Sequence, residues 1–177
     1  MTAAEAIEIA AEAEFDGVDL MVRDLVDSGA DATALRRRMD ALGLRGGGWT
    51  LPMNWKNDQL AFEADLARLP RYAEAAAELG LLRTGTWVRF ESEPLGDDVL
   101  DDPDRRAEQA ARSLAWQAER LGRIADVLAA SGSRLGLEIL GSRSERTGRG
   151  VPLTTSYEEL LRTFSELRRA HPNVGVL

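Results

Sequence analysis

Short apolar segments alternate with longer helical patterns five times along this chain, and this alternation limits the possible folds more than any other feature. The strand-like segments are residues 15–20, 45–51, 82–88, 133–141 and 173–177. Strands separated by helices are typical of βαβ crossovers, which build a parallel sheet. No linker rich in proline or glycine interrupts the pattern, so residues 1–177 are expected to form one α/β domain.

Helix starts are marked by capping residues followed by apolar residues at helical spacing. They are Thr2 with Glu5, Asp31, Asp58, Asp102 before Pro103, and Thr155 with Glu158. Pro70 lies inside the helical pattern that ends at Gly80, and we expect it to kink or divide that helix because proline lacks an N–H.

The composition excludes several classes of protein. A formal net charge of −8 opposes nucleic-acid binding. No apolar run approaches the roughly 18 residues of a membrane span, and the acidic N-terminus does not resemble a secretory signal. The absence of cysteine excludes disulfides and thiolate metal sites. We therefore expect a cytoplasmic protein that binds neither nucleic acid nor membrane.

Glu138 lies near the C-terminal end of the apolar segment 133–141. A buried parallel strand seldom carries a charge, because a carboxylate removed from water needs a metal, a cation or several donors. Active sites of α/β folds lie at the C-terminal ends of strands. Glu138 is thus a candidate site residue, although a structural ion pair with an arginine would also account for it.

Four segments together resemble the xylose isomerase-like barrels, a group described as sugar phosphate isomerases and epimerases. They are residues 15–20 (FDGVDL), Leu79-Gly80 before a strand, residues 120–125 (RLGRIA) and especially residues 135–141 (LGLEILG). The resemblance extends over nearly the whole chain, in the order of the family. It implies a parallel (β/α) barrel of TIM type, of which this chain holds about five of the eight units. A complete barrel usually needs about 250 residues.

The resemblance also implies a metal site. The family holds a divalent cation (Mn²⁺, Mg²⁺, Co²⁺ or Zn²⁺) with a Glu on the fifth strand, an Asp on the sixth, a His and a second Glu. Glu138 matches the first ligand, and the Asp is expected beyond Leu177. The first strand and the other ligands have no counterpart, so we expect a chain truncated at both ends. Such a chain should not bind the cation tightly and should be inactive by itself.

Several further residues follow the strand-like segments and are candidates for substrate binding. Trp49, Trp55 and Trp87 could form a wall for a sugar, or simply pack in the core and loops. Asn54 and Lys56 could contact polar substrate groups. Arg143, in the loop after Glu138, could bind a phosphate or sugar hydroxyls, although a solvated loop is the simpler interpretation.

The function implied by the resemblance is a metal-dependent isomerase or epimerase of a small sugar, polyol or sugar phosphate, with Glu138 as catalytic metal ligand. The alternative is a non-catalytic fragment or binding module of the same fold that lacks a complete metal site. An open segment of five strands exposes two sheet edges and half of a barrel interior, so we expect a homo-oligomer.

Overall fold

The computed structural model describes residues 1–96, 102–140 and 148–177, and its centre is one parallel sheet. The sheet order follows the chain order, β1-β2-β3-β4-β5, and every neighbouring pair is parallel. Each crossover therefore moves one strand along the sheet, as in a singly wound barrel. The strands are β1 (Gly17–Leu20), β2 (Arg45–Thr50), β3 (Arg83–Trp87), β4 (Arg134–Glu138) and β5 (Val174–Val176).

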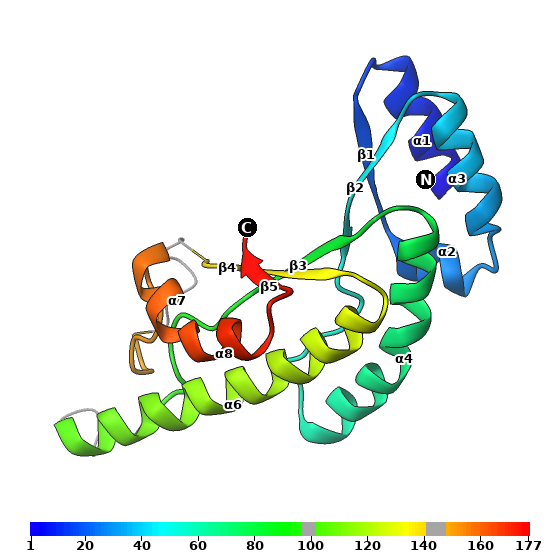
Figure 1. Ribbon diagram of the computed structural model, residues 1–177. Coiled ribbons are helices and arrows are strands. Elements are labelled where there is room, and N and C mark those ends of the chain that lie inside the picture. Colours follow the sequence, from blue (N-terminus) through cyan, green and yellow to red (C-terminus); the bar gives the residue numbers. More distant parts are fainter. Residues whose placement is uncertain (97–101, 141–147) are drawn as a thin grey trace.

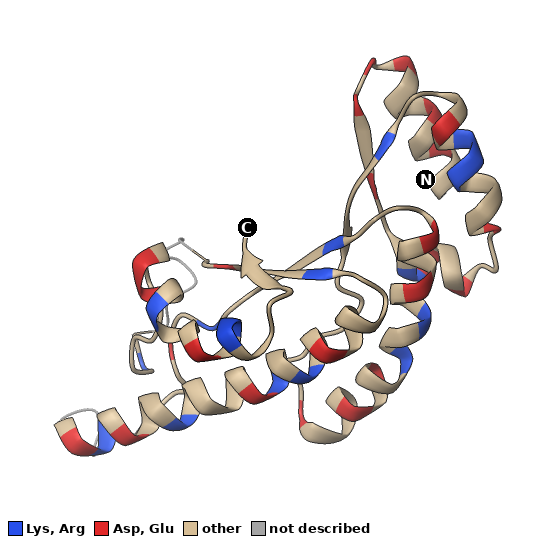
Figure 2. Cartoon of the chain, viewed as in Figure 1, with Lys and Arg blue, Asp and Glu red and all other residues tan. Residues whose placement is uncertain are grey.

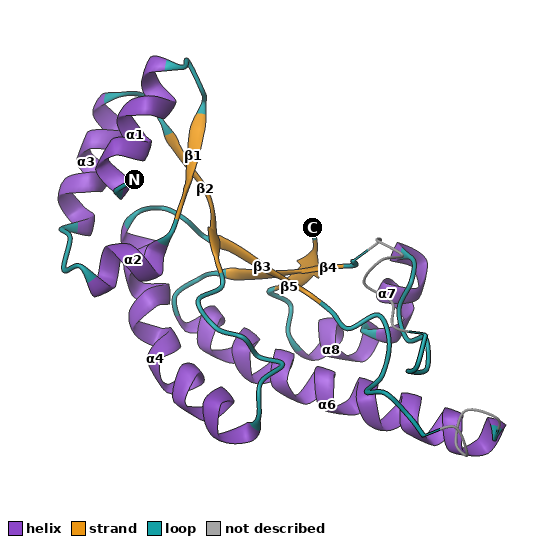
Figure 3. Ribbon diagram, turned by 180° about the vertical axis from the view of Figure 1, so that it is seen from behind, coloured by secondary structure: helices purple, strands orange, loops and turns teal. Residues whose placement is uncertain are grey.

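The helices lie along one side of this sheet, which we call the outer face, and leave the concave inner face bare (Figures 1 and 3). They are α1 (Ala3–Glu12), α2 (Val22–Asp27), α3 (Ala32–Ala41), α4 (Gln59–Glu78), α6 (Pro103–Ala130), α7 (Tyr157–Thr163) and α8 (Ser165–Ala170). This arrangement confirms the predicted α/β class and the partial (β/α) barrel.

Most predicted helix starts are confirmed by their hydrogen bonds. Thr2 and Glu5 form a capping box, and the carboxylates of Asp31, Asp58 and Asp102 accept from backbone N–H groups one turn on. Within the described residues, no helix is long and apolar enough to cross a membrane.

Three local expectations were wrong or incomplete. The last capping box is formed by Ser156 and Glu159, one residue after the predicted pair. Pro70 does not divide α4, which runs unbroken for 20 residues because buried side chains on both sides of the proline pack against the core. The short helix α2 has no side-chain cap, so it was not predicted from capping residues.

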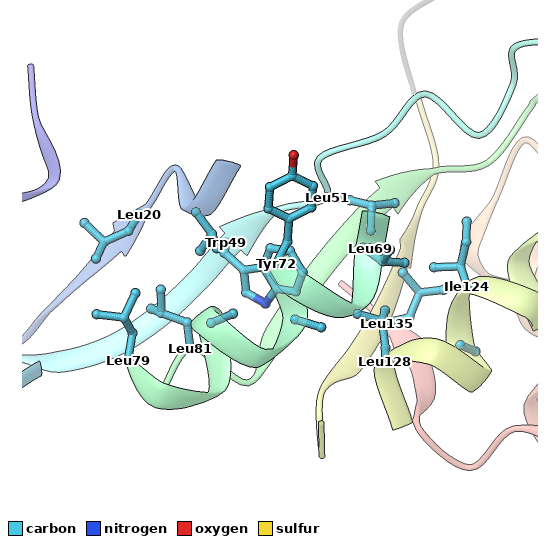
Figure 4. Packing of buried hydrophobic residues seen from close by; sticks show 14 of the residues in the cluster. Leu20, Trp49, Leu51, Leu69, Tyr72, Leu79, Leu81, Ile124, Leu128 and Leu135 are labelled. Atoms are coloured by element: carbon cyan, nitrogen blue, oxygen red, sulfur yellow. The ribbon is translucent and has the colours of Figure 1, made fainter. Parts of the chain in front are cut away.

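The hydrophobic core fills the space between the outer face and the helices. Figure 4 shows Trp49, Leu81 and Leu135 from the strand layer packed with Leu69 and Tyr72 of α4, and with Ile124 and Leu128 of α6. Charged residues of both signs alternate along the outer surfaces of α4 and α6 (Figure 2). One ion pair joins these helices, because Arg123 binds both carboxylate oxygens of Glu63 at 2.7 and 2.6 Å.

Candidate functional site

The inner face of the sheet is lined by alternate strand residues, and its middle row has almost no side chains. Gly85, Gly136 and Gly175 lie in register across β3, β4 and β5. The Leu177 side chain lies over the first two glycines, since a Cβ at either position would meet its atoms. A Cβ at Gly175 would meet nothing within 4 Å. Open space therefore remains at Gly175, where barrels usually carry branched side chains, while Leu177 fills the space over the other two glycines.

Glu138 and Trp87 lie at the carboxyl ends of β4 and β3 as direct register partners. Both line a cavity of about 660 Å³ on the inner face, together with Leu177. Trp87 is 52% exposed, which is unusual for an indole on a strand. An accessible aromatic face therefore lies beside a carboxylate at the edge of the sheet where parallel α/β folds place their active sites.

The carboxylate of Glu138 has no hydrogen-bond or salt-bridge partner in the part of the chain that the structure describes. Its backbone oxygen, by contrast, accepts from the N–H of Val88 at 2.9 Å. An ion pair with an arginine, the structural explanation for Glu138, is therefore not formed among these residues. Arg143, the proposed contact in the loop that follows, lies outside the described residues.

The metal site implied by the resemblance was tested against the donor side chains. Over residues 1–96, 102–140 and 148–177, no three His, Cys, Asp or Glu side chains cluster closely enough to hold a metal ion. Asp19 also lines the cavity, but its Oδ1 accepts from the N–H of Gly48 at 2.5 Å. The described residues therefore do not fit a complete metal site, and the ligand role of Glu138 stays a prediction.

The other two predicted tryptophans belong mainly to the core. Trp49 and Trp55 are 3% and 1% exposed, although both border the cavity. The indole N–H of Trp55 donates to the hydroxyl of Thr86 at 2.9 Å, and its ring lies 5.6 Å from that of Trp116. Of the predicted aromatic wall, Trp87 is therefore the member with a substantial accessible surface.

Asn54 and Lys56 lie on the loop between β2 and α4, at the rim of the cavity. The Asn54 amide is used within the loop: it donates to Oδ1 of Asn57 at 2.9 Å and accepts from the N–H of Lys56 at 3.2 Å. The Lys56 ammonium is half-buried and lies 5.4 Å from the centre of the Trp55 ring. Burial and the nearby Arg89 guanidinium lower the pKa of Lys56 below its usual value.

Sequence reasoning missed Arg120, which holds this loop in place. Its side chain is 2% exposed, and Nη1 donates to the carbonyls of Trp55 and Asn57 at 2.7 and 2.5 Å. The guanidinium also lies over the rings of Phe62 and Trp116. A signal was present, because Arg120 falls at helical spacing within the apolar face of α6, between Gln117 and Ile124, where a polar residue needs a buried partner.

Comparison with known proteins agrees with this geometry. The family model for xylose isomerase-like TIM barrels matches residues 7–177. A search of curated protein sequences gives no significant match.

Among solved structures, the chain resembles a xylose isomerase domain protein from Alicyclobacillus acidocaldarius subsp. acidocaldarius, with a TM-score of 0.78 and 22% identity over 100% of this chain. It resembles D-psicose 3-epimerase from Clostridium cellulolyticum H10 in complex with D-tagatose, with a TM-score of 0.64 and 18% identity over 98% of the chain. It also resembles the IOLI protein with a bound zinc atom, with a TM-score of 0.66 and 12% identity over 99% of the chain.

The chain spans 58%, 56% and 57% of these three structures, respectively. At such identities the structural likeness establishes the fold alone, whereas the family match extends over nearly all of the sequence. The chain belongs to the xylose isomerase-like TIM barrel family.

Proposed function

We propose that the inner-face cavity binds a small sugar or polyol, and that the chain supplies the sugar-binding part of an isomerase or epimerase. The observation that carries this proposal is the register pair at the carboxyl ends of β3 and β4. There the exposed Trp87 lies beside Glu138, whose carboxylate has no partner among the described residues.

A sugar ring matches this pair chemically. Its C–H face is apolar enough to stack on an indole, and its hydroxyl groups donate hydrogen bonds to a carboxylate. The glycine row adds depth at Gly175, where a Cβ would meet nothing within 4 Å, whereas the Leu177 side chain lies over Gly85 and Gly136. The cavity volume of about 660 Å³ lies within the range of small-molecule sites.

Sugar isomerisation moves a proton between adjacent carbons, and a carboxylate can carry that proton. Glu138 would remove the proton from the carbon next to the carbonyl, leaving its electron pair in an enediolate. Return of the proton to the neighbouring carbon gives the isomer, whereas return to the opposite face of the same carbon gives the epimer. A second acid–base group is needed for epimerisation. The described cavity lining also contains Lys56 and Asp19, and Oδ1 of Asp19 already accepts from the N–H of Gly48.

The lack of a metal-ligand cluster among the described residues favours the second candidate function, a non-catalytic binding module of the same fold. The two functions differ in turnover but share sugar binding. Binding and turnover are therefore measured separately on the whole chain, with D-psicose, D-tagatose and D-fructose as probes because solved relatives are described with these sugars.

Binding is followed by intrinsic tryptophan fluorescence. Trp87→Ala and Glu138→Gln should each weaken sugar binding by about tenfold or more, whereas Tyr157→Ala and Glu158→Gln on α7 should not change it. Interconversion of the sugars supports the enzyme, and binding without interconversion supports the module. No binding by the wild-type chain would refute both.

Metal dependence is tested by titrating the chain with Mn²⁺. Saturable binding that Glu138→Gln abolishes would support the ligand role of this residue, whereas identical titrations of both proteins would count against it. The bare inner face and the open edges β1 and β5 also support self-association, which light scattering at several protein concentrations would detect. A monodisperse monomer would contradict the homo-oligomer.

A further inference from the structure

Of the 22 lysine and arginine residues in this chain, only Lys56 is a lysine. Lys56 lines the main cavity together with Glu138 and Trp87, so its charge can act on a bound ligand. It also borders two adjoining cavities of about 560 and 540 Å³. The lining of the main cavity therefore includes a lysine as well as the Glu138 carboxylate.

The Lys56 ammonium lies near the Arg89 guanidinium and the Trp55 ring, and it has no counter-ion among the described residues. No carboxylate in the described parts of the chain forms an ion pair or hydrogen bond with it. Its neighbour Arg89 is bound to Glu93 and lies 4.9 Å from the centre of the Trp116 ring, so that carboxylate is already engaged. A half-buried ammonium beside another cation costs free energy that an incoming anion would offset.

The backbone around Lys56 is fixed independently of any ligand. Arg120 binds the carbonyl groups of the residues on both sides, Trp55 and Asn57, and Nη2 of Arg89 lies 3.5 Å from the carbonyl oxygen of Lys56. The side chain of Asn54 accepts from the Lys56 N–H. An ordered loop of this kind places the ammonium at the cavity rim without a further entropy cost for the backbone on binding.

We propose that Lys56 forms an anion subsite of the sugar cavity, so that the ligand carries a phosphate or carboxylate group in addition to its hydroxyl groups. The proposal rests on the sugar-binding function proposed above and narrows its substrate class. An ammonium is a compact charge without the planar fork of an arginine, so it accepts either kind of anion. The choice between phosphate and carboxylate is left to the probes.

The single lysine allows a direct experiment. Reductive methylation with isotope-labelled formaldehyde marks only Lys56 and the N-terminal amine, and it preserves both positive charges. The Lys56 methyl signal is then followed by NMR during titration of the whole chain with D-fructose, D-fructose 6-phosphate, D-gluconate and inorganic phosphate, at constant ionic strength.

At least one anionic sugar should shift the Lys56 signal saturably and bind at least about tenfold tighter than D-fructose. The N-terminal signal should not move. A response to D-fructose 6-phosphate alone assigns the subsite to phosphate, and a response to D-gluconate alone assigns it to carboxylate. Lys56→Met should remove the advantage of the anionic sugar while D-fructose still binds, and Arg169→Gln, which removes an exposed charge on α8, should preserve it.

The failures of the two proposals are distinguishable. Equal affinity for D-fructose and both anionic sugars would overturn the anion subsite and leave the sugar-binding function intact. A saturable shift with inorganic phosphate, but with no sugar, would keep the subsite and overturn sugar binding. No shift and no binding with any probe would overturn both, and this measurement on the wild-type chain does not depend on whether a variant folds.

Discussion

The two faces of the sheet differ in how far their own side chains fill the space in front of them. On the outer face, the register row Thr84, Leu135 and Val174 is buried against the helices. On the inner face, the next row is Gly85, Gly136 and Gly175; among the described residues, the side chain of Leu177 lies over the first two and nothing lies close to the third. Neighbouring residues of the same strands thus differ in role: one row packs in the core, and the next row borders the inner-face cavity.

This difference shows that stability and ligand binding are separated by strand alternation. A residue that points outward contributes to a packed core, where a missing methyl group leaves a cavity. A residue that points inward borders open space, so the fold does not require a side chain there. Such a position can carry a glycine or a candidate functional residue such as Glu138. Substitutions at adjacent positions should therefore have unequal effects on the free energy of unfolding.

The largest expected difference is between Leu135→Ala and Leu177→Ala. Leu135 is fully buried on the outer face, so its truncation should lower the free energy of unfolding by about 2–5 kcal/mol. Leu177 is 58% exposed on the inner face, and its truncation should cost less than about 0.5 kcal/mol. Urea denaturation of both variants measures the difference, and equal losses would contradict a core confined to the outer face.

Arg120→Met should loosen the loop that carries Lys56, because Arg120 joins this loop to helix α6 of the outer layer. The substitution keeps much of the apolar volume but removes the hydrogen bonds to the carbonyls of Trp55 and Asn57. Leaving buried acceptors unpaired should cost about 1–3 kcal/mol. Hydrogen exchange should also show faster exchange in the loop that carries Lys56. Unchanged exchange there would mean that Arg120 does not hold the loop, and Arg112→Met on the exposed side of α6 serves as the control.

One added methyl group on each face tests the difference between the packed outer face and the open inner face. The two positions are Gly46 on β2 and Gly136 on β4. A Cβ at Gly46 would lie 2.8 Å from the backbone oxygen of Gly80 on the outer side, so Gly46→Ala should cost about 1–3 kcal/mol. A Cβ at Gly136 would meet only the flexible Leu177 side chain, so Gly136→Ala should stay within about 0.5 kcal/mol of wild type. Thermal unfolding compares them, and a reversed order would place the packed layer on the inner face.

The sequence predicts the outer face better than the inner one, for physical reasons. Periodicity and caps are local, so the five strands and the long helix before Ala130 could be found from neighbouring residues alone. The position of Glu138 on a strand end could be found in the same way. The burial of Trp49 depends on the irregular pairing of β1 with β2, and the exposure of Trp87 on its inward position at the end of β3; composition reveals neither. Arg120 was missed because its partners are backbone carbonyls more than 60 residues away.

Lowering the pH should reduce the free energy of unfolding by less than these substitutions do, through carboxylates of the outer layer. The Arg123 guanidinium lowers the pKa of Glu63 at the α4–α6 junction, and the hydroxyl of Thr155 lowers that of Glu159 at the start of α7. A carboxylate whose pKa is lower in the folded chain than in the unfolded one stabilises the fold above the unfolded value of about 4.3. That contribution is lost as the pH falls through the folded pKa, because the carboxylate then takes up the proton.

Urea denaturation at pH values from about 6 down to 3 should therefore give a falling free energy of unfolding, and Glu63→Gln should flatten part of the fall. Glu74→Gln, on the same helix, should not, because Glu74 forms no ion pair within the described residues. Glu63 joins two helices of the outer layer, so an acid profile in Glu63→Gln as steep as in the wild type would mean that this ion pair does not stabilise the junction of α4 and α6.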